Sequence, residues 1–296
     1  MPYPTSVFKT SVYLPDALKR RLEAVAARTR RSEAELIREA IDHLVSEKGR
    51  PAGAPDPPVP GRLVGVGVGP GAADLVTVRA VQALRRATVV VAPCTSPEAI
   101  GRAETIVRGA APDVVVERLV FAMTPDPDDR ADALAAAATR VTTLLDAGEE
   151  VAFVTIGDPN VYSTFSSIAA ALVAARPATP VVTVPGIMAF QELAARSGTV
   201  LVDGQQSFVV LPANATRSPL TDALADPTRA VVVYKGGGKM PAVAAELLAA
   251  GRLDGSVLGE LLGMPGERVA AVADVADRPA SYLSSVIVPA TAGESA

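Results

Sequence analysis

The segment GRPAGAPDPPVPG, residues 49–61, constrains this chain most, because it holds five prolines in thirteen residues. Proline fixes φ and lacks a backbone N–H, so neither a helix nor a central strand continues through such a segment. We therefore expect a linker, partly in the polyproline II conformation, with a reach of about 35–40 Å. The linker divides the chain into a short segment, 1–48, and a long one that begins at residue 62.

The segment before the linker has the pattern of one strand followed by two helices. Residues 6–15 alternate and are rich in β-branched and aromatic side chains, which favours a strand. A first helix is expected to open at Pro15 and Asp16, and its apolar face consists of Leu18, Leu22, Val25 and Ala26. Ser32 and Glu35 have the spacing of a capping box. The second helix is expected to bury Leu36, Ile37, Ala40, Ile41 and Leu44, and since about forty residues are too few for a separate core, a second copy should complete it.

Over residues 7–48 this pattern resembles the ribbon-helix-helix family of transcription factors and antitoxins. The resemblance implies that two chains pair their strands into a ribbon that enters the major groove of double-stranded DNA. Lys9, Ser11 and Tyr13 would then face the groove, and the amides near Ser32 would hold a phosphate. Tyr13 replaces the short polar residue that is usual at its position. A module that dimerises without binding DNA is the alternative interpretation.

Charge and cysteine content narrow the class of protein. Residues 1–50 carry ten basic and seven acidic side chains, a net charge of +3, whereas the remainder carries 18 and 25, a net charge of −7. Only the first segment therefore has the sign expected for a polyanionic partner. One cysteine, Cys94, and one histidine, His43, exclude an internal disulfide and argue against a metal site. No signal peptide or long apolar run is present, so we expect a cytoplasmic protein without a membrane span.

From residue 62 onward, strand and helix patterns alternate, which predicts crossover connections and a mainly parallel sheet. Strands are expected at 62–68, 88–92, 113–119, 149–157 and 180–185, and helices at 74–87, 97–110, 128–148, 161–176 and 187–198. After residue 206 helices become fewer, and strands are expected at 207–213, 229–235, 255–263, 267–274 and 282–290. The expected fold is α/β, with a parallel-sheet subdomain at 62–206, a smaller mixed-sheet subdomain at 207–290 and a tail at 291–296.

Three glycine-proline turns each follow an expected strand: GVGPG at 67–71, GDP at 157–159 and VPGI at 184–187. The first is neither a dinucleotide turn nor a phosphate loop, because Pro70 interrupts it and no GK[ST] follows. The second, with a helix expected near Asn160, places Asp158, Tyr162, Ser163 and Thr164 at the carboxyl end of a strand. Ligands bind at that edge of open α/β sheets, so we expect the three turns to outline one cleft.

As a set, these turns resemble the tetrapyrrole methylase family, the S-adenosylmethionine-dependent enzymes of the cobalamin and siroheme pathways, over residues 62–290. GDPNVYSTF followed by LPAN resembles the branch that methylates carbon 20 of precorrin-2. The resemblance implies a two-fold dimer, a tetrapyrrole substrate and S-adenosylmethionine folded between the subdomains. The cofactor-binding residues that it implies are Pro70, Ile156, Gly157, Asp158, Val161, Met188, Ala189, Lys235 and, less directly, Ala271.

Methyl transfer from a sulfonium to an electron-rich carbon mainly requires that the two carbons be held about 3–3.5 Å apart. This explains why no Ser-His-Asp or Cys-His set is needed. Tyr162 is the candidate for orienting substrate or handling a proton, with packing alone as the alternative. Asp158 either bonds a cofactor amine or caps its turn, and Cys94 is expected to be structural. Cations available for substrate carboxylates are Lys235, Lys239, Arg217 and Arg130, each of which is otherwise a solvated surface charge.

Two functional hypotheses follow. The first is a C20-methyltransferase of corrin biosynthesis, acting on precorrin-2 or cobalt-factor II, whose N-terminal segment gives a homodimer one ribbon beside two active sites. The second is a DNA-binding regulator whose methylase-like domain senses S-adenosylmethionine or a corrinoid. Ala72 and Ala73 motivate the second, because they stand where the family has an acidic residue after GPG, while Asp74 follows and is expected to cap a helix.

Overall fold

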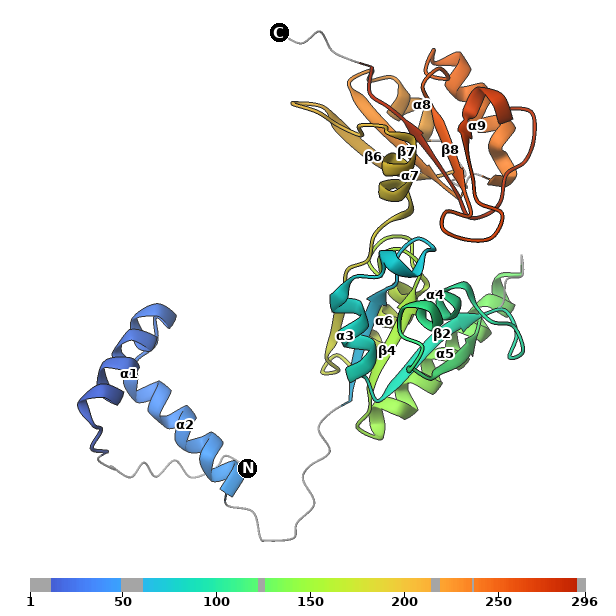
Figure 1. Cartoon of the computed structure of the whole chain (residues 1–296). Coiled ribbons are helices and arrows are strands. Elements are labelled where there is room, and N and C mark those ends of the chain that lie inside the picture. Colours follow the sequence, from blue (N-terminus) through green and yellow to red (C-terminus); the bar gives the residue numbers. More distant parts are fainter. Residues whose placement is uncertain (1–11, 49–60, 122–125, 214–218, 236, 292–296) are drawn as a thin grey trace. The chain divides into compact units, whose positions relative to one another are not determined.

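The computed structural model describes residues 12–48, 61–121, 126–213, 219–235 and 237–291, without the side chains of 42–48. The chain forms two compact units, Met1–Pro57 and Pro58–Ala296, which are treated separately below (Figure 1). Lys9, Ser11, Arg217 and most of the expected linker, of the expected first strand and of the tail lie outside the described residues. No helix in the described ranges is both long enough and apolar enough to cross a membrane.

The first unit contains the two expected helices, α1 (Asp16–Thr29) and α2 (Glu33–Lys48), drawn in blue in Figure 1. The predicted capping box is confirmed between them. The Ser32 hydroxyl accepts a hydrogen bond from the Glu35 amide at 3.2 Å, and the Glu35 carboxylate accepts one from the Ser32 amide at 2.9 Å. Arg30, at φ 53°, ends α1 in a left-handed conformation.

In a single chain the apolar faces of these helices remain largely uncovered, which is consistent with the expectation that a second copy completes the core. Leu18 is 46% exposed, Ala40 and Ile41 are exposed, and Leu36 and Ile37 are half-buried. Residues 12–14, the described end of the expected strand, are not in a strand. The reason is geometric: two helices cover each other along one seam, and a second layer is needed to bury the remaining apolar face.

The first sheet of the second unit is parallel, as expected, with strand order β3-β2-β4-β1-β5. Its strands are β1 (Arg62–Gly67), β2 (Val89–Cys94), β3 (Val116–Val120), β4 (Glu150–Thr155) and β5 (Val181–Val184). The helices after these strands are α3 (Val78–Arg86), α4 (Arg102–Ala110), α5 (Pro127–Asp146), α6 (Thr164–Ala175) and α7 (Ala189–Ser197), with a 3-10 turn, η1 (Ala73–Leu75), before α3.

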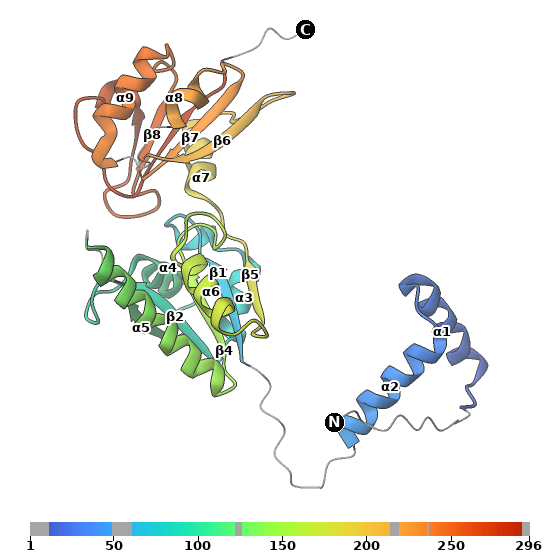
Figure 2. The ribbon, with the colours of Figure 1, turned by 180° about the vertical axis from the view of Figure 1, so that it is seen from behind.

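Side chains of this sheet alternate between two faces, as strand geometry requires. Val64 and Val154 pack with α3 and α4, whereas Leu63 and Phe153 pack with α5 and α6. Figure 1 shows α3 and α4 on the near face, and Figure 2 shows α5 and α6 on the other. Both faces are therefore covered, and only the strand ends remain open to a ligand.

Two helices begin later than their patterns predict. The chain turns at 96–99, where the Ser96 hydroxyl accepts from the Ala99 amide at 3.2 Å, so α4 begins at Arg102 rather than at residue 97. The Ser163 hydroxyl accepts from the Phe165 amide at 2.9 Å and caps α6 at Thr164 rather than near Asn160. Residues 95–101 and 156–163 are consequently loops at the carboxyl edge of the sheet.

The second sheet is mixed, as expected, with strand order β6-β7-β10-β8-β9 and only the β6–β7 pair parallel. Its strands are β6 (Ser207–Pro212), β7 (Arg229–Tyr234), β8 (Val257–Glu260), β9 (Arg268–Ala271) and β10 (Ser284–Val288). Its helical elements, which the sequence pattern underestimated, are α8 (Pro219–Leu224), η2 (Gly237–Lys239), α9 (Met240–Ala249) and η3 (Val272–Val275).

α8 and α9 cover one face of the second sheet, and α7 covers the other. Leu193 of α7 is fully buried and packs with Val232 and Ile287. α7 follows the last strand of the first sheet in the chain but belongs by packing to the second. The start of α7, at the third glycine-proline turn, therefore lies where the two sheets approach each other.

Candidate active site

The neighbouring strands β2 and β4 define a topological switch point in the first sheet. β2 connects through α4 to β3 on one side, and β4 connects through α6 to β5 on the other. Open α/β sheets bind ligands in the crevice at such a point. Beside this point Gly69, which follows β1, and Gly157, which follows β4, form an isolated bridge, with the Gly157 amide donating to the Gly69 carbonyl at 2.8 Å.

The three predicted turns meet at this point. A Cβ on Gly67 would lie 2.4 Å from the Gly157 carbonyl oxygen, and a Cβ on Gly186 would lie 2.0 Å from the same atom. Both positions therefore exclude any side chain. Gly157 is constrained differently: its φ is +69°, but a Cβ there would have the Met188 sulfur, at 3.4 Å, as its nearest neighbour. Backbone conformation, rather than space, requires glycine at Gly157 in this structure.

Asp158 joins the second turn to the third. One carboxylate oxygen accepts from the Asn160 amide at 2.8 Å and the other accepts from the Gly186 amide at 3.1 Å. The side chain is not part of the cavity wall described next. This geometry fits the turn-capping role, one of the two roles that the sequence left open for Asp158.

A cavity of about 620 Å³ lies at the carboxyl edge of the first sheet, within the usual size range of ligand sites. Loops after β1, β2 and β4 line it, together with residues of β7, β8 and β10. Most of the predicted cofactor residues are in its wall: Pro70, Ile156, Gly157, Val161, Met188, Ala189 and Lys235. Ala271 is not, because it lies exposed at the end of the edge strand β9.

Tyr162 also lines the cavity and is held by the second subdomain. Its hydroxyl donates to the Val210 carbonyl at 3.1 Å, and its ring meets that of Tyr234 edge-on with 6.4 Å between centroids. The Lys235 ammonium donates to the Tyr162 carbonyl at 3.3 Å and lies 6.0 Å from the ring centroid. Tyr162 is 45% exposed, so its ring is available to a ligand while its orientation is fixed.

Backbone strain is concentrated in this wall. Tyr162, Lys235 and Leu261 have φ values of 49°, 57° and 49°, although none is glycine, and all three line the cavity. Such conformations are uncommon for side-chain-bearing residues and gather at functional sites. Among the described residues Arg30, at the end of α1, is the other example.

Two serines of β10 were missed by the sequence reasoning. Ser284 and Ser285 are 5% and 3% exposed, line the cavity, and have no side-chain hydrogen bond to any residue that the structure describes. Ser285 pairs in register with Tyr234 on one side and Gly259 on the other. Two hydroxyls inside the apolar strand pattern YLSSVIVPA are the signal that was available, since hydroxyl side chains within an otherwise apolar strand need a polar partner or an open cavity.

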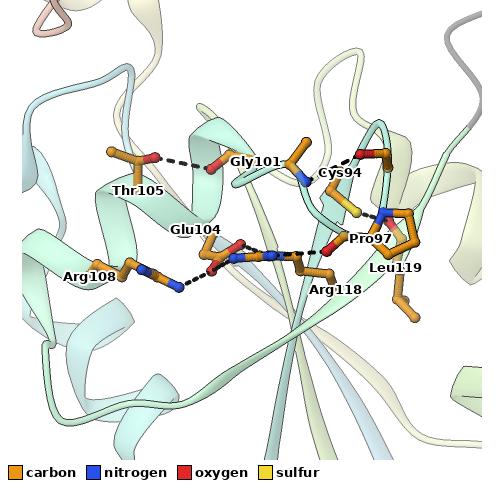
Figure 3. Close-up of polar contacts among 10 residues, drawn as sticks. Cys94, Pro97, Gly101, Glu104, Thr105, Arg108, Arg118 and Leu119 are labelled. Atoms are coloured by element: carbon orange, nitrogen blue, oxygen red, sulfur yellow. Dashed lines mark hydrogen bonds and ion pairs between the residues drawn. The ribbon is translucent and has the colours of Figure 1, made fainter.

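Cys94 and a buried ion-pair cluster support the opposite part of the wall (Figure 3). The Cys94 thiol donates to the Leu119 carbonyl at 3.4 Å, and burial raises its pKa, so the thiol stays protonated, as a structural role requires. Glu104 of α4 is 1% exposed and accepts from Arg118 Nε at 2.7 Å and from Arg108 Nη2 at 2.6 Å. These arginines, Arg118 above all, hold the pKa of Glu104 below its usual range.

The charges in the cavity wall are all positive. Arg102 and Lys235 line the cavity, and no Asp or Glu is among its lining residues, all of which lie in the described ranges. Of the other expected cations, Lys239 and Arg130 are outside the wall. The described residues contain no group of three or more His, Cys, Asp or Glu placed to hold a metal ion.

Comparison with known proteins agrees with this geometry. The family model of the Tetrapyrrole (Corrin/Porphyrin) Methylases matches residues 62–276, so the chain belongs to that family. The model of the ribbon-helix-helix proteins of the copG family matches residues 9–48, so the N-terminal segment is a ribbon-helix-helix segment.

Similar proteins include a precorrin-2 C(20)-methyltransferase of Sinorhizobium sp, 37% identical, with 77% of this chain and 95% of the relative aligned. A cobalt-precorrin-2 C(20)-methyltransferase of Salmonella typhimurium is 29% identical over 77% of this chain and 96% of the relative. The fold is also that of the uroporphyrin-III C-methyl transferase from Thermus thermophilus, crystallised with S-adenyl homocysteine (TM-score 0.55, 23% identity, 77% and 92% of the two chains covered). The chain is thus an S-adenosylmethionine-dependent methyltransferase.

Proposed function

We propose that this enzyme transfers a methyl group to carbon 20 of precorrin-2 or of its cobalt-containing counterpart, cobalt-factor II. The observation that carries the proposal is the cavity itself, at the switch point of the parallel sheet, with an apolar and hydroxyl-bearing wall whose charges are all positive. Such a wall suits a large polycarboxylate ring. The likeness to the Sinorhizobium protein along nearly its whole length supports the choice of substrate.

The residues of the three turns fit S-adenosylmethionine. Gly67 and Gly186 let the three turns pack backbone against backbone, which brings the turns to one edge of the sheet. Pro70, Ile156, Gly157 and Val161 would hold the cofactor from the first two turns, and the third turn and second sheet would contribute Met188, Ala189, Lys235 and the hydroxyls of Ser284 and Ser285. Asp158 would act on the cofactor through the turns that it joins.

When bound, the cofactor supplies a methyl group that is already activated on a sulfonium. The protein therefore has to orient the tetrapyrrole, exclude water and accept a proton, and orientation supplies most of the rate enhancement. Tyr162 suits the orienting role, since the Val210 carbonyl fixes its hydroxyl proton and leaves the oxygen lone pairs free to accept a hydrogen bond from substrate.

A methylation assay tests the proposal. Purified protein is incubated with isotope-labelled S-adenosylmethionine and precorrin-2, prepared with and without cobalt, and the product is examined by NMR for label at carbon 20. Label at carbon 20 supports the proposal and identifies the preferred metal state, whereas label at another carbon contradicts the position. Tight binding of both ligands without turnover would favour the alternative function, a DNA-binding regulator that senses them.

For the N-terminal segment we propose a homodimeric ribbon that binds double-stranded DNA and holds a cytoplasmic enzyme dimer near it. The half-exposed apolar faces of α1 and α2 favour a second copy, and Tyr13, predicted to face the groove with Lys9 and Ser11, is 95% exposed. Closed two-fold symmetry in both parts of the chain is compatible with one dimer. The alternative is that the segment dimerises without binding DNA. A role in transcription requires that it bind DNA.

Binding of the full chain to duplex DNA, measured at several salt concentrations, separates these outcomes. Affinity should fall steeply with salt, and Lys9→Ala should reduce the slope of log K against log salt by about one unit if Lys9 contacts a phosphate. No binding at low salt, with a dimer still present in solution, would leave dimerisation as the function of the segment.

A further inference from the structure

Arg102 is a cation in the cavity wall with no role in the fold. It is the first residue of α4 and lines the cavity beside Gly101 and Ala103. It is exposed, and within the described part of the chain it has no hydrogen bond or ion pair. The other cation of the wall, Lys235, donates to the Tyr162 carbonyl and is thereby engaged.

The position of Arg102 opposes helix stability. The first turn of a helix carries the positive end of the helix dipole, so a cation there is unfavourable and an acid is preferred. Glu104, in the same turn, supplies that acid but is committed to Arg118 and Arg108. Neither packing nor pairing within the described part of the chain explains an arginine at this place.

The backbone that carries Arg102 is fixed from several sides. Arg118 holds the Glu104 carboxylate with two nitrogens, at 2.7 and 3.0 Å, and donates to the Pro97 carbonyl at 2.9 Å. Gly101 packs so closely on the end of β2 that a Cβ would lie 2.3 Å from the Pro93 carbonyl oxygen. Figure 3 shows this cluster joining α4, β3 and the 95–101 loop. The base of the Arg102 side chain is therefore preorganised, which lowers the entropic cost of binding.

We propose that Arg102 is a specificity-determining residue that binds a carboxylate of the tetrapyrrole substrate. The inference rests on the proposed function, because a polycarboxylate ring brings several carboxylates into a cavity that has no acids of its own, whereas the cofactor brings one. A guanidinium binds a carboxylate through two parallel N–H donors, which fixes orientation as well as affinity. Arg102 would thus set which edge of the ring faces the cofactor turns.

The test uses the full-length protein and uroporphyrin III, a stable tetrapyrrole with eight carboxylates, whose binding is followed by fluorescence. Arg102→Ala should weaken its binding about 10- to 100-fold, the value of a lost hydrogen bond to a charged group. The affinity of Arg102→Lys for uroporphyrin III should lie between those of the wild type and Arg102→Ala, because lysine keeps the charge but lacks the planar pair of N–H donors. With precorrin-2, the same variants should raise KM more than they lower kcat.

Arg79 provides a matched control. It is an exposed arginine in the first turn of α3, also without a partner among the described residues, and it is outside the cavity wall. Arg79→Ala should bind uroporphyrin III as the wild type does. Both alanine variants should keep their Tm or raise it slightly, since each removes a cation from a helix start.

The outcomes separate the two proposals. Wild-type protein that neither binds uroporphyrin III nor methylates precorrin-2 contradicts the proposed function. Wild-type protein that does so, together with Arg102→Ala matching Arg79→Ala in porphyrin affinity, overturns the role of Arg102 alone. A loss of S-adenosylmethionine affinity in Arg102→Ala as large as its loss of porphyrin affinity would also overturn it, because the residue would then belong to the cofactor site.

Discussion

In α1 and α2 the apolar side chains that the structure describes remain exposed or half-buried, whereas in the second unit strands with similar apolar content are sealed on both faces. Leu18 and Phe153 are both large apolar side chains on faces with an apolar pattern. Leu18 is nevertheless 46% exposed, whereas Phe153 is 0% exposed. The difference is the number of layers: three in the parallel subdomain, one in the helix pair. An amphipathic sequence pattern therefore shows which face of an element must be covered. The three-dimensional structure shows whether the same chain covers that face.

The largest effect is expected from deleting residues 1–60, which removes the helix pair and leaves the second unit. The second unit should keep methyl transfer within about twofold, because a proline-rich linker transmits little force, while DNA binding should be abolished. Turnover, DNA binding and mass in solution are measured on both proteins. A truncated enzyme that is monomeric or inactive would show that the N-terminal segment is structural and would contradict its proposed role of holding the enzyme near DNA.

Within the second unit, Glu104→Gln should cost on the order of 2–3 kcal/mol of unfolding free energy, since it removes the charge-assisted hydrogen bonds that Arg118 and Arg108 donate to a buried carboxylate. Glu117→Gln is the control, because Glu117 pairs with Arg140 at the surface of β3 and should cost about 1 kcal/mol or less. The pKa of Glu104 is depressed in the fold, so its contribution is complete above the ordinary carboxyl value of 4.5 and is lost as pH falls through the lower folded value. Urea titrations should show the gap between the wild type and Glu104→Gln closing in acid, and a constant gap would contradict this.

Gly157→Val and Asp158→Ala should each weaken S-adenosylmethionine binding, roughly 10- to 100-fold in calorimetry, a loss of about 1.4–2.8 kcal/mol. The first forces a β-branched residue to φ +69°, and the second frees the Asn160 and Gly186 amides. Both changes act on the edge where the turns meet and leave the N-terminal helices untouched. Unchanged affinity in both variants would place the cofactor elsewhere.

Tyr162→Phe should lower kcat about 10-fold with little change in cofactor affinity, if the hydroxyl acts on substrate in the transition state. The variant keeps the ring contact with Tyr234 and removes only the hydroxyl. Steady-state kinetics on both proteins check this, and identical constants would reduce Tyr162 to packing.

Ser32→Ala should have the smallest effect, about 1 kcal/mol on the helix pair, because it removes one capping hydrogen bond. Circular dichroism of the full chain at several protein concentrations measures the change. Methyl transfer should be unaltered. A loss of turnover would show that catalysis in the second unit depends on the helix pair.

The sequence predicted the parallel sheet and the meeting of the three turns because both depend on local signals. Apolar runs mark buried strands, and glycines such as Gly67 and Gly186 mark places where backbones touch. The late start of α4 was not predicted, because a weak Ser96 turn competes there with a good helix pattern. That error placed Arg102 inside a helix, so its place in the cavity was missed.

The periodicity of α1 and α2 identified their apolar faces but not what covers them. The need for a second copy was predicted from the shortness of the segment, because no sequence period distinguishes a face covered by the same chain from one covered by another. Ser284 and Ser285 were overlooked for a related reason, since a strand pattern records whether a position is apolar and not what lies opposite it.

The left-handed backbone at Tyr162, Lys235 and Leu261 has a consequence for laboratory evolution. At each position the left-handed conformation lowers the free energy of unfolding by on the order of 1 kcal/mol relative to glycine. A selection that scores only survival on heating should therefore tend to exchange these residues for glycine or asparagine, and a selection that scores corrin output should retain them. Sequencing these three codons after each selection would show whether stability or corrin output had been selected.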